Sequence, residues 1–187
     1  MTGAEFDAWM AQGQAAVEAA LQTWVPADAP AGLGTAMRYG VLDGGKRLRP
    51  LLVMAAAQAA GGPAAAALRA AAAVELIHAY SLVHDDMPCM DNDVLRRGKP
   101  TVHVQFGQAQ AMLAGDAMHT LAFEILTAPP GAEAAFDLEP ALQARLCALL
   151  ARASGHAGMA GGQAIDLASI GLALTEAQLR DMHRRKT

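Results

Sequence analysis

The stretch that decides the fold is residues 64–93, AAAALRAAAAVELIHAYSLVHDDMPCMDND. It starts just after Pro63 and consists largely of strong helix formers. Ala70, Val74, Ile77 and Ser81 are spaced three or four residues apart, so they would lie on one face of a helix. Pro88 disfavours helical geometry at the residue before it, so we expect one long helix that ends at about Asp86.

Four carboxylates lie at the end of this predicted helix within nine residues: Asp85, Asp86, Asp91 and Asp93. Carboxylates this close repel one another unless cations lie between them. On a continuous helix Asp91 would lie about 120° around the axis from Asp85, so a shared ion requires the helix to end between them. Mg²⁺ takes one or two protein carboxylates and completes its shell with water and substrate phosphates. The cluster therefore predicts a Mg²⁺ site, with a solvated acidic loop as the alternative.

Two cationic turns flank the helix. Residues 44–50, GGKRLRP, place three cations on a glycine-opened turn before a helix N-terminus, which also favours anions. Residues 96–101, RRGKPT, add cations just beyond the aspartates. The first turn lacks the spacing and the preceding strand of a nucleotide P-loop, and helix capping is its alternative role. Acids, metal and bases together predict a site for a phosphorylated substrate rather than for an acyl or glycosyl group.

Helical signals cover most of the chain. A capping box at Thr2–Glu5 opens a first helix, which is broken at Pro26, and a second box at Thr175–Gln178 opens the last helix. Between them we expect further helices near residues 33–41, 51–60, 108–126 and 140–168. Apolar residues make up 53% of the chain and aromatic residues only 4%, which favours closely packed, alanine-rich helices. Without strand alternation or repeats, the predicted fold class is an all-α helical bundle that forms a single domain over residues 1–187.

Composition argues against several other functions. The net charge of −4 disfavours a nucleic-acid partner. Cys89 and Cys147 have no paired metal spacing and suit a reducing compartment, so we expect a cytoplasmic protein. The N-terminus carries Glu5 and Asp7 rather than the basic region of a signal peptide. No uncharged apolar run approaches about 18 residues, so we expect no membrane span.

Five motifs, in this order and spacing, resemble those of the trans-prenyl diphosphate synthase family. They are residues 44–50 (GGKRLRP), Glu75-x-x-His78-x-Tyr80-Ser81-Leu82-x-His84-Asp85-Asp86, residues 96–101 (RRGKPT), Gly115-Asp116-Ala117, and Gly161-Gly162-Gln163-x-x-Asp166. The two extra residues within the first aspartate cluster resemble those of bacterial farnesyl diphosphate synthases. The resemblance implies an isoprenoid-synthase-type helical bundle whose C-terminal helices, with a second aspartate-rich motif, are missing from this chain.

The resemblance also implies which residues bind which group. Asp85 and Asp91, supported by Asp86, would coordinate Mg²⁺ ions that hold the allylic diphosphate, which Arg96 would also contact. Isopentenyl diphosphate would be bound by Lys46, Arg49, His78 and Arg97.

Further residues would act in catalysis. Lys186 and Thr187 match the start of a Lys-Thr motif of the family. Its lysine would contact the allylic diphosphate, and the motif would stabilise the nascent cation. Gln163 and Asp166 would line the cavity that holds this cation. The implied reaction is ionisation, condensation and elimination. It joins isopentenyl diphosphate to dimethylallyl or geranyl diphosphate without a protein nucleophile, and the resemblance also implies a homodimer.

Product length is predicted from two residues of the long helix. Tyr80 and Ser81 lie five and four residues before Asp85, so they point from the acidic end toward a tail pocket, and a fifteen-carbon product is expected. The alternatives are geranyl or geranylgeranyl diphosphate synthesis, a terpene cyclase, and a non-catalytic truncated subunit. A terpene cyclase would not need the cations of residues 44–50, and a chain that ends at Thr187 is expected to have negligible activity alone.

Overall fold

The computed structural model describes residues 2–42, 44–129 and 138–186. The chain divides into two compact units, Met1–Glu139 and Pro140–Thr187. The single domain over residues 1–187 stays a prediction. The fold class is confirmed as all-α, because the regular secondary structure of the described residues is helical except for one hairpin of two-residue strands.

The first unit contains most of the helices. In chain order its elements are α1 (Gly3–Trp24), the 3-10 turn η1 (Pro30–Gly32), α2 (Leu33–Val41), α3 (Leu48–Ala59), α4 (Ala64–Asp85), β1 (Leu95–Arg96), β2 (Lys99–Pro100), α5 (Val102–Phe106) and α6 (Gln108–Glu124). The strands pair antiparallel, with Leu95 opposite Pro100 and Arg96 opposite Lys99. The sequence did not predict this hairpin or the short helix α5.

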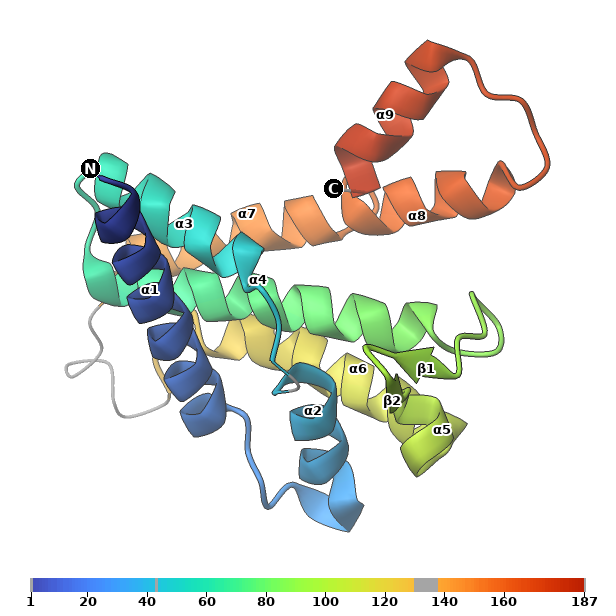
Figure 1. Ribbon diagram of the computed structural model, residues 1–187, viewed down its shortest axis with the longest axis horizontal. Coiled ribbons are helices and arrows are strands. Elements are labelled where there is room, and N and C mark those ends of the chain that lie inside the picture. Colours follow the sequence, from blue (N-terminus) through green and yellow to red (C-terminus); the bar gives the residue numbers. More distant parts are fainter. Residues whose placement is uncertain (1, 43, 130–137, 187) are drawn as a thin grey trace. The chain divides into compact units, whose positions relative to one another are not determined.

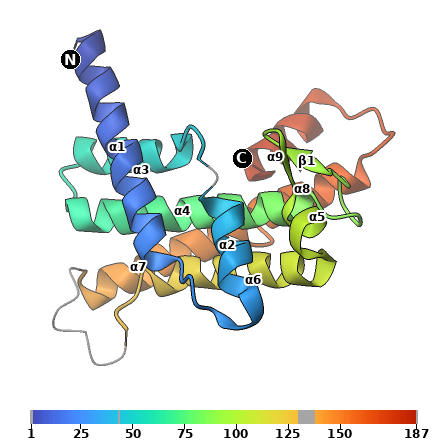
Figure 2. The same ribbon diagram turned by 60° about the horizontal axis from the view of Figure 1, so that its bottom comes forward.

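Helix α4 lies at the centre of the first unit, with α3 and α6 packed along it and α1 crossing it (Figures 1 and 2). Alanines at its contact positions, including Ala71, Ala72 and Ala73, have no exposed surface. Their small side chains let the neighbouring helices approach closely. Leu76 is also fully buried, and burial of such a side chain stabilises the fold by about 1.5–3 kcal/mol.

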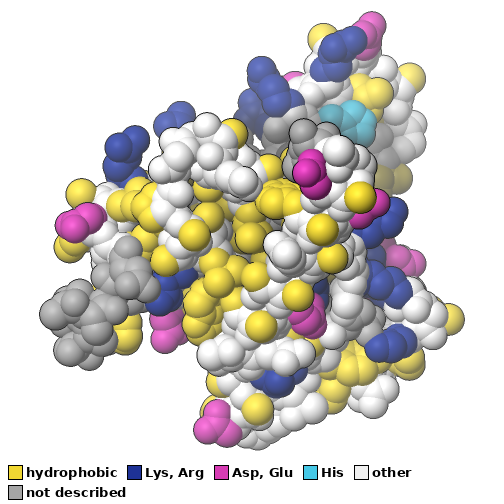
Figure 3. Space-filling model, turned by 60° about the vertical axis from the view of Figure 1, so that its left-hand side comes forward, with side chains coloured by type: hydrophobic (Ala, Val, Ile, Leu, Met, Phe, Trp, Pro, Cys, Tyr) yellow, Lys and Arg dark blue, Asp and Glu magenta, His cyan; other side chains and the backbone are white. Residues whose placement is uncertain are grey.

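Helix α4 is also long and apolar enough to cross a membrane, judged by length and composition alone. Half of its most apolar window is buried inside the protein, and the core helix of a water-soluble protein meets the same criteria. Two charged residues interrupt the run, Arg69 and Glu75, and Glu75 is buried in an ion pair. On the face shown in Figure 3, basic and acidic side chains are interspersed among apolar ones.

The local signals at helix ends are confirmed. Thr2 and Glu5 form the predicted capping box, with Thr2 N donating to Glu5 Oε2 at 2.6 Å and Glu5 N donating to Thr2 Oγ1 at 3.3 Å. Helix α4 ends at Asp85, close to the predicted Asp86. Helix α3 begins at Leu48 rather than at residue 51, with Pro50 in its first turn, where its missing N–H is tolerated.

The second unit contains α7 (Pro140–Ser154), α8 (Met159–Ala168) and α9 (Glu176–Lys186). The prediction of one helix over residues 140–168 was wrong, because the chain breaks between Ser154 and Met159. A Cβ atom at Gly158 would lie 1.9 Å from the carbonyl oxygen of Ala153, so only glycine fits this bend. The capping box before α9 is confirmed, with Gln178 N donating to Thr175 Oγ1 at 3.3 Å.

Candidate active site

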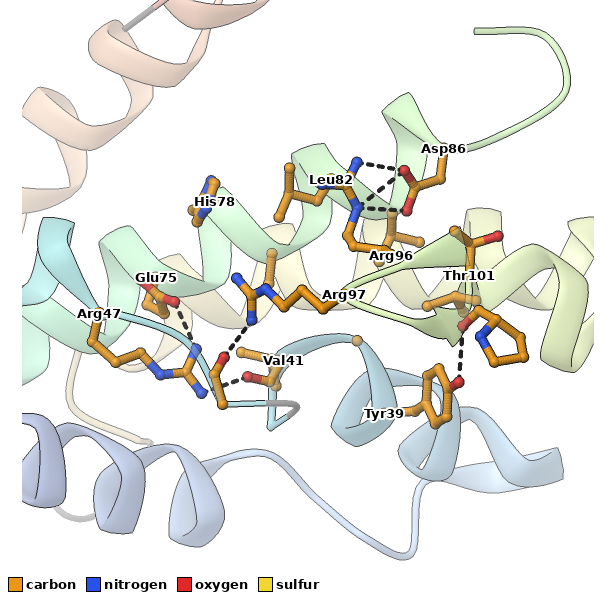
Figure 4. A pocket seen from close by; sticks show the side chains of 16 residues that line it. Tyr39, Val41, Arg47, Glu75, His78, Leu82, Asp86, Arg96, Arg97 and Thr101 are labelled. Atoms are coloured by element: carbon orange, nitrogen blue, oxygen red, sulfur yellow. Dashed lines mark hydrogen bonds and ion pairs between the residues drawn. The ribbon is translucent and has the colours of Figure 1, made fainter. Parts of the chain in front are cut away.

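A pocket in the first unit opens between the end of α2, the C-terminal half of α4 and the β1–β2 hairpin (Figure 4). Its walls combine an apolar floor with charged groups. The residues that line it include Tyr39, Gly44, Arg47, Glu75, His78, Asp86, Arg96, Arg97 and Thr101. The cationic turns predicted from the sequence therefore meet the last turns of α4 at one place.

The chain turns sharply after α4, as Pro88 predicts. Asp91 N donates to the carbonyl oxygen of Asp85 at 2.8 Å, and Asn92 has a left-handed φ of 55°. This turn brings the backbone of Asp91 back to the end of the helix. The side chain of Asp85 is half-buried and that of Asp91 is exposed, so both carboxylates lie near an open edge.

Asp86 differs from its neighbours because its carboxylate points into the protein and pairs with Arg96. Asp86 is 2% exposed, and it accepts three hydrogen bonds from Arg96: from Nε at 3.1 and 2.9 Å and from Nη2 at 2.6 Å (Figure 4). The hydrogen bonds to Asp86 raise the pKa of Arg96 despite partial burial of its guanidinium. This fork geometry fixes the hairpin against the end of α4.

Arg47 is the buried cation of the 44–50 turn. Its guanidinium donates to Glu75 Oε1 at 2.6 Å, to Glu18 Oε2 at 2.7 and 3.2 Å, and to the carbonyl oxygen of Val41 at 2.8 Å. Burial lowers the pKa of Arg47, but hydrogen bonds to Glu75 and Glu18 outweigh it and the pKa is raised. Two carboxylates thus surround this one guanidinium.

His78, on the pocket side of α4, lies among the remaining cations. Arg49 Nη1 lies 3.4 Å from His78 Nε2, and Arg96 and Arg97 line the same pocket. Burial lowers the pKa of His78 below its ordinary value of 6.5, and the positive charge of Arg49 lowers it further. Glu75 acts in the opposite direction, and Arg97 and Arg96 make smaller lowering contributions. Positive charge concentrated around a neutral imidazole favours an anion.

The hairpin holds Arg97 over the 44–50 turn. Arg97 and Gly98 have left-handed φ values of 54° and 80°, as a tight two-residue hairpin turn requires. Arg97 Nη1 donates to the carbonyl oxygen of Gly44 at 2.5 Å. Gly45 has a φ of 137°, a backbone conformation that residues with a side chain rarely adopt, so glycine is favoured at this point of the turn.

Comparison with known proteins identifies this arrangement of helices and charges. The sequence profile named Polyprenyl synthetase matches residues 30–187. The chain belongs to the polyprenyl synthetase family. Its relatives include the farnesyl diphosphate synthase of Geobacillus stearothermophilus, 45% identical over 92% of this chain and 57% of that protein. Geranylgeranyl pyrophosphate synthase 4 of Arabidopsis thaliana is 44% identical over 98% of this chain and 48% of that protein.

Solved structures agree with the family assignment. A crystal structure of an FPP/GFPP synthase from Zymomonas mobilis superposes with a TM-score of 0.90 at 44% identity, covering 100% of this chain and 66% of that chain. The farnesyl diphosphate synthase of Escherichia coli is 52% identical over 81% of this chain and 49% of that protein. This polyprenyl synthetase chain thus spans about half the length of the curated relatives it matches.

The structure brings together only some of the predicted site residues. His78, Arg96, Arg97 and Asp86 line the pocket. Arg49 and Lys46 are exposed on the 44–50 turn and do not line it, although Arg49 lies 3.4 Å from His78. The roles assigned to these residues in this polyprenyl synthetase stay predictions.

Tyr80 and Ser81 lie on α4 outside the pocket lining. The Tyr80 ring packs against His119 of α6 at a centroid distance of 4.7 Å and against His84 at 5.7 Å. Burial raises the pKa of the Tyr80 phenol, and the charge of Asp85 adds to this. Ser81 Oγ donates to the carbonyl oxygen of His78 at 2.9 Å.

The other predicted catalytic residues belong to the second unit. Lys186 of α9 forms an ion pair with Asp166 of α8, both predicted for the same cavity. Gln163 also lies on α8 and is half-buried. A Cβ at Gly162 would lie 2.3 Å from the backbone nitrogen of Lys186, so glycine lets α8 and α9 meet closely. Thr187 lies outside the described residues.

The acidic end of α4 partly fits a Mg²⁺ ion. Asp85 and Asp91 offer the one or two carboxylates that this ion takes beside substrate phosphates. Both oxygens of Asp86 accept hydrogen bonds from Arg96, so the predicted trio does not converge on one point. Over residues 2–42, 44–129 and 138–186, no group of three acidic, histidine or cysteine side chains could hold a metal ion.

Sequence reasoning missed three residues that shape the pocket. Arg47 was counted as one of three cations on the 44–50 turn, without its burial or its ion pairs being foreseen, and Glu18 was not singled out. Tyr39 donates its hydroxyl to the carbonyl oxygen of Pro100 at 2.8 Å and so holds the hairpin against α2. The sequence offered one indication of the buried ion pair, at Glu75, because a carboxylate within the apolar face of a predicted core helix needs a buried partner.

Proposed function

We propose that the protein of which this chain is a part is a prenyltransferase that condenses isopentenyl diphosphate with dimethylallyl or geranyl diphosphate to give farnesyl diphosphate and diphosphate. The observation that carries this proposal is the concentration of guanidinium groups around His78 beside the acidic end of α4. Membership of the polyprenyl synthetase family supports it.

The residues of this chain divide the work between two diphosphates. Lys46, Arg49, His78 and Arg97 bind isopentenyl diphosphate, whose charge the guanidinium groups offset. The allylic diphosphate binds at the acidic end of α4, where Arg96 contacts it. Mg²⁺, held by Asp85 and Asp91, would stabilise the charge of the departing diphosphate.

The remaining chemistry needs orientation rather than a nucleophile. Once the allylic carbon–oxygen bond breaks, the double bond of isopentenyl diphosphate attacks the allylic cation, a new carbon–carbon bond forms, and a proton leaves to the released diphosphate. Holding both substrates at the two ends of one pocket makes this step effectively intramolecular. Lys186, Thr187 and Gln163 would stabilise the cation.

A fifteen-carbon product is the specific proposal, with geranyl or geranylgeranyl diphosphate as the alternatives. Tyr80 fills space between α4 and α6 through its contact with His119, which suits a barrier to tail growth. Relatives of this chain include both farnesyl and geranylgeranyl synthases, so Tyr80 and Ser81 are the positions to test. We further propose a cytoplasmic homodimer.

The test is turnover of labelled isopentenyl diphosphate with dimethylallyl or geranyl diphosphate, with Mg²⁺ and with a chelator. A form that carries a second aspartate-rich motif is compared with residues 1–187 alone. We expect Mg²⁺-dependent farnesyl diphosphate from the extended form and negligible product from residues 1–187. Absence of turnover in both forms, with substrate binding retained, would instead favour a non-catalytic subunit.

A further inference from the structure

Arg47 differs from the cations beside it on the 44–50 turn. Lys46 and Arg49 are exposed, whereas Arg47 is 5% exposed and its side chain points into the first unit. Figure 4 shows its guanidinium facing Glu75 on α4 and the end of α2 at Val41. Adjacent residues of one basic motif therefore serve different purposes.

The partners of Arg47 come from three separate elements. Glu18 belongs to α1, Val41 ends α2 and Glu75 belongs to α4, and all three accept hydrogen bonds of 2.6 to 3.2 Å. A further bond supports the same turn, because Gln14 of α1 donates to the carbonyl oxygen of Lys46 at 3.0 Å. The position of the turn is thus fixed by hydrogen bonds to α1, to the end of α2 and to α4.

The backbone of Arg47 is also unusual. Its φ is 47°, a left-handed value that costs a non-glycine residue free energy unless the surroundings hold it. Because α3 starts at the next residue, this conformation sets the direction in which α3 leaves the turn and where Arg49 lies. Arg49 then reaches His78 at 3.4 Å.

We propose that Arg47 is a positioning residue for isopentenyl diphosphate: it fixes residues 44–49 so that Lys46 and Arg49 face the diphosphate. This inference rests on the proposed function. Arg47 contributes no free charge of its own, since Glu18 and Glu75 together offset it. Its effect on substrate is therefore geometric, through the two exposed cations beside it.

The primary test compares Arg47→Met with Arg38→Met in the extended, active form. Arg38 is a matched control, because it also fixes a helix junction, donating to the carbonyl oxygens of Gln22 at 2.9 Å and Val25 at 2.7 Å, but it does not line the pocket. For Arg47→Met we expect the KM for isopentenyl diphosphate to rise about tenfold, with kcat within about threefold and the allylic KM unchanged. Arg38→Met should leave both KM values unchanged.

A double variant, Arg47→Met with Glu75→Met, separates positioning from stability. Removing one partner of a buried ion pair destabilises a fold, whereas replacing both by apolar residues is often neutral. The double variant should therefore melt closer to the wild type than Arg47→Met does, while its KM for isopentenyl diphosphate stays raised. Calorimetric titration with isopentenyl diphosphate gives the same comparison without turnover.

The outcomes are distinct. A raised KM for isopentenyl diphosphate in both Arg47 variants supports positioning. An unchanged KM in either variant, or a loss confined to kcat and melting temperature, overturns it, because a purely structural role lowers the amount of active enzyme rather than its affinity. Failure of the wild-type extended form to condense the two substrates would count against the proposed function, and calorimetry would then decide the role of Arg47 separately.

Discussion

Replacing Asp86 by alanine should destabilise the protein far more than replacing Asp91, although both belong to one acidic motif. Asp86→Ala leaves the guanidinium of Arg96 without the partner that accepts three of its hydrogen bonds. Breaking a fully buried ion pair costs about 3–5 kcal/mol. The Asp86 side chain is 4% exposed but that of Arg96 is 36% exposed, so water can solvate the remaining cation and we expect about 2–3 kcal/mol.

That loss should lower the melting temperature by about 4–12 °C for a chain of this size. Asp91 is exposed, so Asp91→Ala should change the free energy of unfolding by less than about 0.5 kcal/mol. Its turnover should nevertheless fall at least about a hundredfold, as should that of Asp85→Ala, because these carboxylates are proposed to hold metal.

Thermal melts and steady-state kinetics at saturating Mg²⁺ test both halves of this prediction. Asp7→Ala, at an exposed position of α1, is the control for removing one surface carboxylate. Wild-type melting of Asp86→Ala would refute the buried pair with Arg96. Near-normal turnover of Asp91→Ala would refute the metal assignment.

Three further predictions concern α4 and its neighbours. Tyr80→Ala should lengthen the product and Ser81→Phe should shorten it, and chromatography of dephosphorylated products that shows no change would refute both assignments. Because the folded-state pKa of His78 is lowered, the folded state binds fewer protons than the unfolded state below about pH 6.5. The wild type should therefore lose stability relative to His78→Gln as the pH falls from 6.5, and parallel thermal melts across this range measure the loss. Inorganic diphosphate should reduce it. Gly115→Ala would place a Cβ 2.1 Å from His84 Nε2 and should destabilise by about 1–3 kcal/mol, whereas melting like the wild type would contradict this close packing of α4 on α6.

The sequence was most informative where structure depends on residues a few positions apart. Capping boxes and the proline after Asp86 act within one turn of a helix, so the ends of α1, α4 and α9 followed from them. The same reasoning should have divided residues 140–168, because Gly155 and Gly158 interrupt that stretch.

The direction of individual side chains could not be predicted in this way. Arg47 pairs with Glu75, 28 residues later, and Asp86 pairs with Arg96, ten residues later. Both pairs depend on how separate elements pack, which composition and spacing do not encode. The cations around His78 were nevertheless foreseen as a group, because two of the five motifs, residues 44–50 and 96–101, carry them.

If two diphosphates bind as proposed, the small β1–β2 hairpin would couple their binding. Its adjacent arginines extend to opposite ends of the pocket, Arg96 to Asp86 at the end of α4 and Arg97 to the carbonyl oxygen of Gly44. A ligand that orders one arginine therefore orders the shared turn that holds the other. Each diphosphate would then raise the affinity for the other by the same factor, so the order in which they bind cannot change their total binding free energy. Cooperativity between substrates would then originate in six residues, Leu95 to Pro100.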